Sequence, residues 1–318
     1  MFKRWNDKYP VYIIIVSLLL FACLVAGCTT SQPTATPPAM AVTLQPTTPA
    51  PLQTGVSQPV LTTAAPSTTT ATPASTYTPS EKTLVVFTAA SLKGASGKLG
   101  TEFSKMYPGH TAVFNLDGTQ ALKTQVENGA YADVFISASN TYTNTLKSEG
   151  YFIDSSVKPL TSNYVIVIMP ASNPGTIKSL ADLATHGKKI AMAANSVPVG
   201  TATYAALANL AKSTYSKDWN KSVFSNVVTY ETTEPGVATK VSLGEVDAGF
   251  VYESTYNAAP AGTLTAITIP KADNYLQTYT IGVMKQSHYS GVAQEFADFM
   301  LSGNGQQILK DYGFRPVS

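Results

Sequence analysis

The sequence predicts an α/β protein whose folded part forms two lobes. From residue 81 onward, apolar runs rich in β-branched and aromatic residues alternate with helical segments. Such alternation is typical of α/β lobes with largely parallel sheets. Residues 81–318 are also enough for two lobes of ordinary domain size. In each half of this region, two strand-to-helix junctions carry residues that suit ligand binding, and a cleft between the lobes would bring all four together.

The expected elements follow one another in a regular order. Strands are expected at residues 84–89, 111–116, 132–138, 164–170, 189–193, 226–231, 248–254, 266–270 and 278–284. Helices are expected at residues 92–106, 120–128, 141–149, 179–184, 201–212, 235–243 and 291–312.

The N-terminus has the pattern of an export signal. Lys3, Arg4 and Lys8 precede an apolar run over residues 11–27, which ends in small residues before Cys28. The sequence Val-Ala-Gly-Cys resembles the lipobox of lipoprotein precursors, which predicts a signal peptide at 1–27 and a lipidated Cys28 at the mature N-terminus. The alternative is an uncleaved signal anchor. Both interpretations place the folded part outside the cytoplasm on a membrane tether.

A stalk is expected between this leader and the folded part. Residues 29–80 contain 16 Thr, 10 Pro and no charged residue. Such a segment cannot bury enough apolar surface to offset its ordering entropy. We therefore expect residues 28–80 to be a disordered, semi-extended stalk.

Charge and cysteine content exclude several classes of protein. The net charge of +2 belongs to the leader, because residues 81–318 contain 18 basic and 18 acidic side chains. A nucleic-acid binder would show a basic excess. The two cysteines, Cys23 and Cys28, both lie in the N-terminal segment, which excludes structural disulfides, thiolate metal sites and cysteine nucleophiles from the folded part.

The histidines do not form a catalytic or zinc-binding pattern. They are scattered and no pair has the spacing of a metal site or a serine triad: His110, His186 and His288. We find no acid–base or nucleophilic set, so the sequence predicts a protein that is not an enzyme and has no cofactor.

The strand-to-helix junctions indicate an anion site. Open α/β sheets bind ligands at the carboxyl ends of their strands, where helix N-termini offer free N–H groups. Taken singly, such residues are usually helix caps or turns. Together they predict a cleft lined by neutral donors, suited to a fully deprotonated oxyanion. The junctions are Ser91, Gly118-Thr119, Pro198-Val199-Gly200 and Glu234-Pro235-Gly236, and a further strand ends in Tyr252.

The chain resembles the molybdate-binding proteins of ABC importers over residues 82–316. The motifs that carry the resemblance are VVFTAASL, FNLDGTQALKTQVENGA, ADVFISA, NSVPVG, AGFVY and KDYGFRP. The resemblance implies the two-lobed fold of periplasmic binding proteins, with the ligand cleft between the lobes. Lobe I would comprise residues 81–162 plus 279–318, and lobe II residues 163–278.

The resemblance also implies which residues hold the anion. Matched by motif, the two hydroxyls fall on Ser91 and Thr119, the two backbone amides on Val199 and Glu234, and the phenol on Tyr252. Thr119 stands where the commoner family pattern is a Ser-Ser pair. The preceding Asp117 is expected to order the turn and not to touch the ligand.

Glu234 is unusual because it puts an acid beside an anion site. Archaeal tungstate- and molybdate-binding relatives resemble the chain more loosely and use two carboxylates to coordinate the metal. Glu234 matches one of them, so direct metal coordination is one hypothesis. However, Asn195-Ser196-Val197 occupies the stretch of the other carboxylate. The alternative is a solvent-facing acid that stabilises a helix N-terminus.

The function expected from the resemblance is capture of molybdate or tungstate outside the cytoplasm by a monomeric, lipid-anchored binding protein. Its partners would be an ABC permease and the permease's ATPase subunits, with no nucleic acid involved. The alternatives are the same fold with sulfate, thiosulfate or another small anion as cargo, a stalked surface hydrolase, and an adhesive lipoprotein.

Overall fold

The computed structural model describes residues 82–316. The leader, the stalk and Cys28 lie outside the described residues, so the predictions for them stay predictions. The strands are β1 (Lys82–Ala89), β2 (His110–Asp117), β3 (Val134–Ser137), β4 (Lys158–Pro170), β5 (Ile190–Ala193), β6 (Val227–Glu231), β7 (Ala248–Tyr252), β8 (Leu264–Thr268) and β9 (Leu276–Val283). The α-helices are α1 (Lys93–Met106), α2 (Thr119–Glu127), α3 (Asn140–Ser148), α4 (Pro198–Ser213), α5 (Lys217–Ser225), α6 (Glu234–Ser242), α7 (Glu253–Asn257), α8 (Ser290–Leu301) and α9 (Gly303–Asp311). Short 3-10 helices are η1 (Ala90–Leu92), η2 (Asp154–Ser156) and η3 (Leu180–Ala184).

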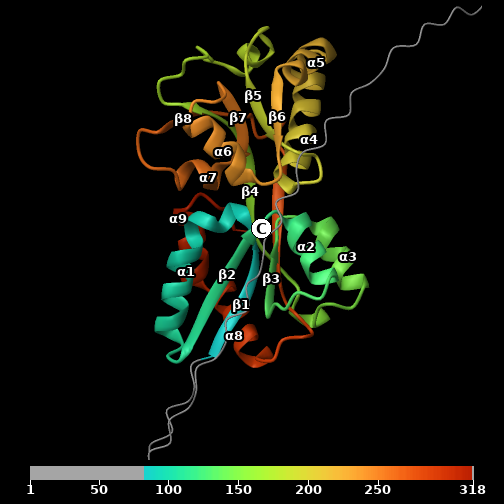
Figure 1. The fold of residues 1–318 in the computed structure, drawn as a ribbon, viewed down its shortest axis with the longest axis vertical. Coiled ribbons are helices and arrows are strands. Elements are labelled where there is room, and N and C mark those ends of the chain that lie inside the picture. The colour runs from blue at the N-terminus through green and yellow to red at the C-terminus, as the bar shows by residue number, and fades with distance from the viewer. Residues whose placement is uncertain (1–81, 317–318) are drawn as a thin grey trace, which may run out of the picture. The chain divides into compact units, whose positions relative to one another are not determined.

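The strands follow the order β2-β1-β3-β9-β4-β7-β5-β6, and β8 pairs with β4. Around β1, the pairings with β2 and β3 are parallel. Around β5, the pairings with β6 and β7 are also parallel. These two parallel groups are the centres of two lobes, which Figure 1 shows one above the other. We call the lobe around β1 the first lobe and the lobe around β5 the second.

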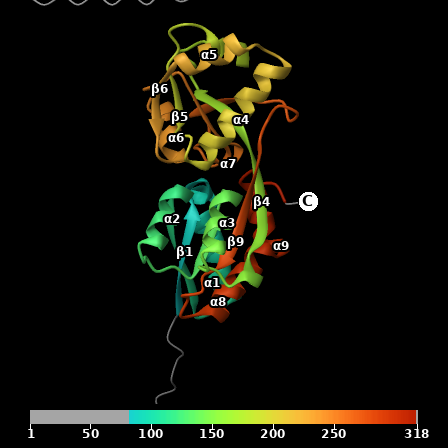
Figure 2. The same cartoon turned by 90° about the vertical axis from the view of Figure 1, so that its right-hand side faces the viewer.

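Strands β4 and β9 connect the two lobes. The first part of β4 pairs with β9, with residues 158–164 opposite residues 276–281. From Val165 onward β4 pairs instead with β7 and β8. Figure 2 shows both strands running between the lobes. Two adjacent crossings of this kind can act as a hinge. The exact lobe boundaries given above stay predictions.

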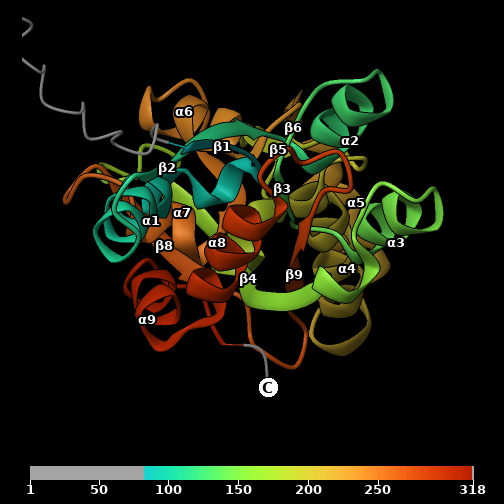
Figure 3. The ribbon, with the colours of Figure 1, turned by 90° about the horizontal axis from the view of Figure 1, so that it is seen from below.

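Helices cover both faces of the sheet in the first lobe, as Figure 3 shows. Leu84 and Val86 of β1 belong to the core that includes Phe103 of α1 and Phe296 of α8. Phe87 belongs to a separate core with residues of α2 and α3. Because side chains alternate along a strand, this apolar run buries both faces of the sheet.

The observed elements differ from the predicted ones in strand direction and in several helices. The long crossing strands pair antiparallel, so the sheets are mixed and less parallel than expected. The predicted helix 291–312 is two helices, because Ser302 adopts an extended conformation and its side chain caps α9 by accepting from Gly305 N–H. Helices α5 and α7 were not expected, and residues 180–184 form a 3-10 helix.

None of the helices described is both long enough and apolar enough to span a membrane.

Gly200 lies in the first turn of α4, where neighbouring backbone atoms leave no space for a side chain. A Cβ atom there would collide with the Ala194 carbonyl oxygen and lie 2.7 Å from that of Ala193. We expect Gly200→Ala to lower the free energy of unfolding by about 1–3 kcal/mol, the range for overpacking.

The control for this variant is Gly97→Ala in α1. A Cβ at Gly97 meets nothing within 4 Å, so this change should raise stability by about 0.5–1 kcal/mol. Urea unfolding measures both, and equal effects of the two variants would contradict the packing argument.

Candidate functional site

A small cavity lies where the two lobes meet. Its volume is about 20 Å³, far below the roughly 300–1,000 Å³ of sites for drug-sized ligands. None of its lining residues, all within 82–316, is Lys, Arg or His. The cavity is lined by Ala89, Ala90, Ser91, Gly118, Thr119, Ala138, Val197, Pro198, Val199, Glu234 and Tyr252. All five residues predicted to hold the anion are therefore brought to one place.

The order of strands and helices explains this convergence. In the first lobe, β1 leads into η1 and β2 leads into α2; in the second, β5 leads to α4 and β6 leads to α6. The carboxyl ends of these strands and the N-terminal ends of the following segments supply the cavity lining. Free N–H groups at helix N-termini favour negative charge.

Ser91 lies in η1, and its side chain forms a hydrogen bond with Tyr279. Its Oγ is 2.8 Å from the Tyr279 hydroxyl, and both side chains are buried. A serine hydroxyl has one proton and two acceptor lone pairs. When Tyr279 donates to Ser91, the serine proton is free to be donated into the cavity.

Thr119 is the first residue of α2 and is also positioned as a donor. Its Oγ1 accepts from Ala138 N–H at 3.1 Å, which leaves the hydroxyl proton available. Asp117 Oδ1 accepts from Gly118 N–H at 2.7 Å. The expectation that Asp117 orders this turn is confirmed.

Val199 lies in the first turn of α4, after Pro198 at the start of the helix. A residue in this position has no intrahelical partner for its N–H. The N–H of Glu234, the first residue of α6, is in the same situation. Thr233 caps α6, but its side chain accepts from the Gly236 N–H. The Glu234 N–H is therefore left free.

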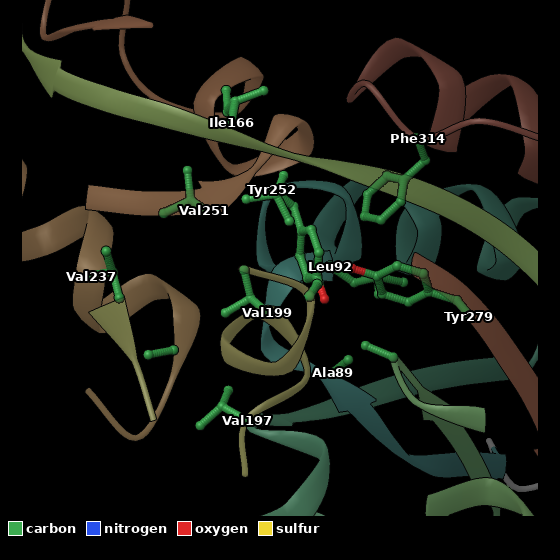
Figure 4. Close-up of a cluster of buried hydrophobic side chains, with 14 of the residues drawn as sticks. Ala89, Leu92, Ile166, Val197, Val199, Val237, Val251, Tyr252, Tyr279 and Phe314 are labelled. Carbon is green, nitrogen blue, oxygen red and sulfur yellow. The ribbon is translucent and has the colours of Figure 1, made fainter. Parts of the chain in front are cut away.

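Tyr252 brings a buried hydroxyl to the cavity from the end of β7. The side chain is 1% exposed, and its oxygen has no hydrogen-bond partner among the described residues. Its ring lies edge-on to that of Tyr279, and Figure 4 shows both among Leu92 and Val199. Burial raises the pKa values of both phenols well above that of an exposed tyrosine, so both keep their proton.

Glu234 is buried, which shows that its interpretation as a solvent-facing acid is wrong. The residue is only 3% exposed. Oε1 accepts from Tyr252 N–H at 2.6 Å, while Oε2 has no hydrogen-bond partner within residues 82–316. Desolvation raises the pKa of Glu234 to about 7, against the lowering effect of the Tyr252 N–H and of the nearby Thr255 hydroxyl, whose position does not meet the geometry of a hydrogen bond to either carboxyl oxygen.

Two of the hydrogen bonds that join the lobes beside the cavity come from first-lobe helices. Gln120 of α2 donates from Nε2 to the Thr232 carbonyl at 2.9 Å. Tyr142 of α3 donates its hydroxyl proton to the Ser196 carbonyl at 2.6 Å. Each bond links a first-lobe helix to a loop that precedes a second-lobe helix.

Three residues that position the site or join the lobes beside it were not predicted from the sequence: Gln120, Tyr142 and Tyr279. Gln120 directly follows Thr119 in the quoted motif and could have been found there. Tyr142 and Tyr279 could not, because their partners are 54 and 188 residues away in the sequence. No group of three or more His, Cys, Asp or Glu residues among residues 82–316 is arranged to hold a metal ion.

A model of the family described as bacterial extracellular solute-binding proteins matches residues 84–315. The chain belongs to this family. The molybdate-binding protein ModA of Mycobacterium tuberculosis is 30% identical over 233 residues, which cover 73% of this chain and 84% of that protein. These relatives bind solutes for transport and are not enzymes, as the sequence predicted.

Two solved structures have the same fold. The periplasmic molybdate-binding protein of Azotobacter vinelandii has a TM-score of 0.64 at 21% identity, covering 74% of this chain and all of that chain. The sulfate-binding protein SubI of M. tuberculosis has a TM-score of 0.66 at 15% identity, covering 74% and 88%. The predicted two-lobed α/β fold is confirmed, while the roles of the five cavity residues stay a prediction.

The raised pKa of Glu234 predicts a pH dependence of stability. The folded protein holds this proton up to about pH 7, whereas the unfolded chain releases it near pH 4.5, the ordinary pKa of a glutamate side chain. The unfolded state therefore binds fewer protons between these values, and stability falls as the pH rises from about 4.5 to 7. Between these pH values, Glu234 should lower the free energy of unfolding of the ligand-free protein by about 3 kcal/mol.

The Glu234→Gln variant isolates this contribution. Its stability relative to the original protein should rise by about 2–3 kcal/mol between about pH 4.5 and pH 8, as measured by urea unfolding. Glu231→Gln, which changes a less buried acid three residues earlier, should show no such rise. A relative stability of Glu234→Gln that stays constant with pH would contradict the assignment.

Proposed function

We propose that this protein captures molybdate or tungstate outside the cytoplasm, as the fully deprotonated tetrahedral oxyanion, and delivers it to an ABC permease. The observation that carries the proposal is the small cavity between the lobes, lined by neutral hydrogen-bond donors and by no cationic side chain. A fully deprotonated oxyanion only accepts hydrogen bonds, so it matches a set of donors.

The residues proposed to hold the anion come from both lobes. Ser91 and Thr119 would donate hydroxyl protons from the first lobe. Val199 and Glu234 would donate backbone N–H groups, and Tyr252 its phenol, from the second. A ligand held in this way favours the closed arrangement over an open one, and a permease with its ATPase subunits would receive the closed form.

The similarity to ModA of M. tuberculosis supports molybdate as the cargo. The structural similarity to a sulfate-binding protein keeps sulfate as the second candidate, because sulfate has the same charge and shape. We further propose that the protein is a monomer, uses no cofactor, and is tethered through a lipidated Cys28, for which the lipobox-like sequence is the support.

Isothermal titration of the full-length protein with molybdate, tungstate, sulfate and phosphate tests the cargo. Molybdate and tungstate should bind and phosphate should not. Sulfate binding as tight as molybdate binding would refute the cargo assignment. Absence of heat with all four anions would refute the proposal that the site binds oxyanions.

Ser91→Ala should weaken molybdate binding by about 1.5–3 kcal/mol, because it removes one hydrogen bond to a charged group. Ser96→Ala is the matched control: this serine is also buried, but its Oγ donates to the Lys93 carbonyl within α1 and does not line the cavity. Titration calorimetry measures both variants. Equal affinities for molybdate in Ser91→Ala and Ser96→Ala would remove Ser91 from the site.

Tyr142→Phe tests whether a hydrogen bond between the lobes slows the dissociation of the ligand. The change removes the bond to the Ser196 carbonyl, and the molybdate dissociation rate should rise about 3- to 10-fold. Stopped-flow fluorescence measures this rate.

The control for Tyr142→Phe is Tyr151→Phe. The Tyr151 hydroxyl makes no hydrogen bond to any described residue, so its removal should leave dissociation unchanged. An unchanged rate in Tyr142→Phe would show that this bond does not restrain opening.

A further inference from the structure

Glu234 lines the cavity and carries a buried carboxyl group besides its backbone N–H. It is the only carboxylic acid among the residues that line the cavity. One carboxyl oxygen is used, since Oε1 accepts from Tyr252 N–H. The other, Oε2, is buried and has no partner among residues 82–316. A buried polar atom without a partner is uncommon in folded proteins and needs an explanation.

The surroundings of Glu234 supply no positive charge. Helix α6 packs against η1, α7 and strands β4 to β7. The ionisable side chains that these elements, the adjoining β9 and α6 itself bring are Tyr164, Tyr230, Tyr252, Tyr256, Tyr279, Glu231, Glu253, Lys158 and Lys240. Two cations come from adjoining segments: Arg315, and the exposed Lys93, which follows η1.

The cations among these groups are not available to Glu234. Lys240 pairs with Glu245, and Arg315 pairs with Glu253 and lies over the Tyr164 ring. Lys158 is at the opposite end of β4, where that strand pairs with β9. A carboxylate at Glu234 would therefore have no cationic partner, and it would repel an anion bound beside it.

We propose that the site takes up its oxyanion together with one proton, which resides on Glu234 and is donated in a hydrogen bond from Oε2–H to an anion oxygen. The inference rests on the proposed function, since it assumes an oxyanion in the cavity. The proton comes from solvent when Glu234 is ionised, and no covalent bond to the anion forms or breaks. Glu234 is thereby a specificity-determining residue and not a metal ligand.

Protonated Glu234 favours an anion that only accepts hydrogen bonds. With Oε2 as a donor, the anion meets donors from Ser91, Thr119, Tyr252 and the two helix N-termini. An ionised Glu234 would instead offer an acceptor, which is what a hydrogen-bearing anion such as hydrogen phosphate requires. The protonation state of this one carboxyl group thus decides which class of anion the site accepts.

The test is titration calorimetry of the full-length protein with sodium molybdate, from about pH 5.5 to pH 8.5, in buffers that differ in ionisation enthalpy. The dependence of the binding heat on the buffer gives the number of protons taken up. We expect uptake to rise from near zero to about one, and the affinity to fall by up to tenfold per pH unit at the alkaline end.

Three variants separate the proton from other roles of the side chain. Glu234→Gln retains a donor and should bind molybdate within about fivefold of the original protein near pH 5.5, without proton uptake and without the alkaline loss. Glu234→Leu has no donor and no titrating group, so it should bind molybdate about 10- to 100-fold more weakly than the original protein near pH 5.5 and show no alkaline loss. Glu231→Gln should behave as the original protein does.

The outcomes distinguish this inference from the proposed function. Molybdate binding by the original protein without proton uptake at any pH overturns the inference alone. Loss of all binding in a folded Glu234→Gln also overturns it, because the ionised carboxylate would then be the ligand. No molybdate heat from the original protein at any pH overturns both proposals. Proton uptake by the original protein is itself decisive, even where a variant fails to fold.

Discussion

The proposed anion, once removed from water, needs a partner for each of its oxygen atoms, and the cavity offers neutral donors instead of cationic side chains. Residues 81–318 are electrically balanced, and the cavity is lined by hydroxyls, helix N-termini and one buried acid. Fixed neutral donors can stabilise charge well in a dry site because they need little reorganisation.

The architecture supplies the donors from two directions. Parallel strands in each lobe end toward the cavity, so the segments that follow them begin there. Strands β4 and β9 join the lobes and leave them free to move about two adjacent crossings. The bonds of Gln120 and Tyr142 then lie beside the cavity. In the proposed function, capture, exclusion of water and release would all depend on this one interface between the lobes.

The fold and the cavity lining could be predicted from the sequence because both depend on local patterns. Apolar runs rich in β-branched residues, followed by helix-starting residues, place Ser91, Thr119 and Val199 at strand-to-helix junctions. The antiparallel crossing strands and the break at Ser302 were not predicted, since pairing partners and helix packing are set by distant segments. The burial of Glu234 could not be predicted either, because a helix N-terminus faces solvent or protein according to tertiary packing.

The most direct test of the central claim is anomalous diffraction at the molybdenum absorption edge, from crystals of the protein grown with molybdate. The account predicts one strong molybdenum peak inside the cavity, within hydrogen-bonding reach of the Ser91, Thr119 and Tyr252 hydroxyls through the anion's oxygens. A peak only at the protein surface, or no peak in the cavity while molybdate is bound in solution, would contradict it.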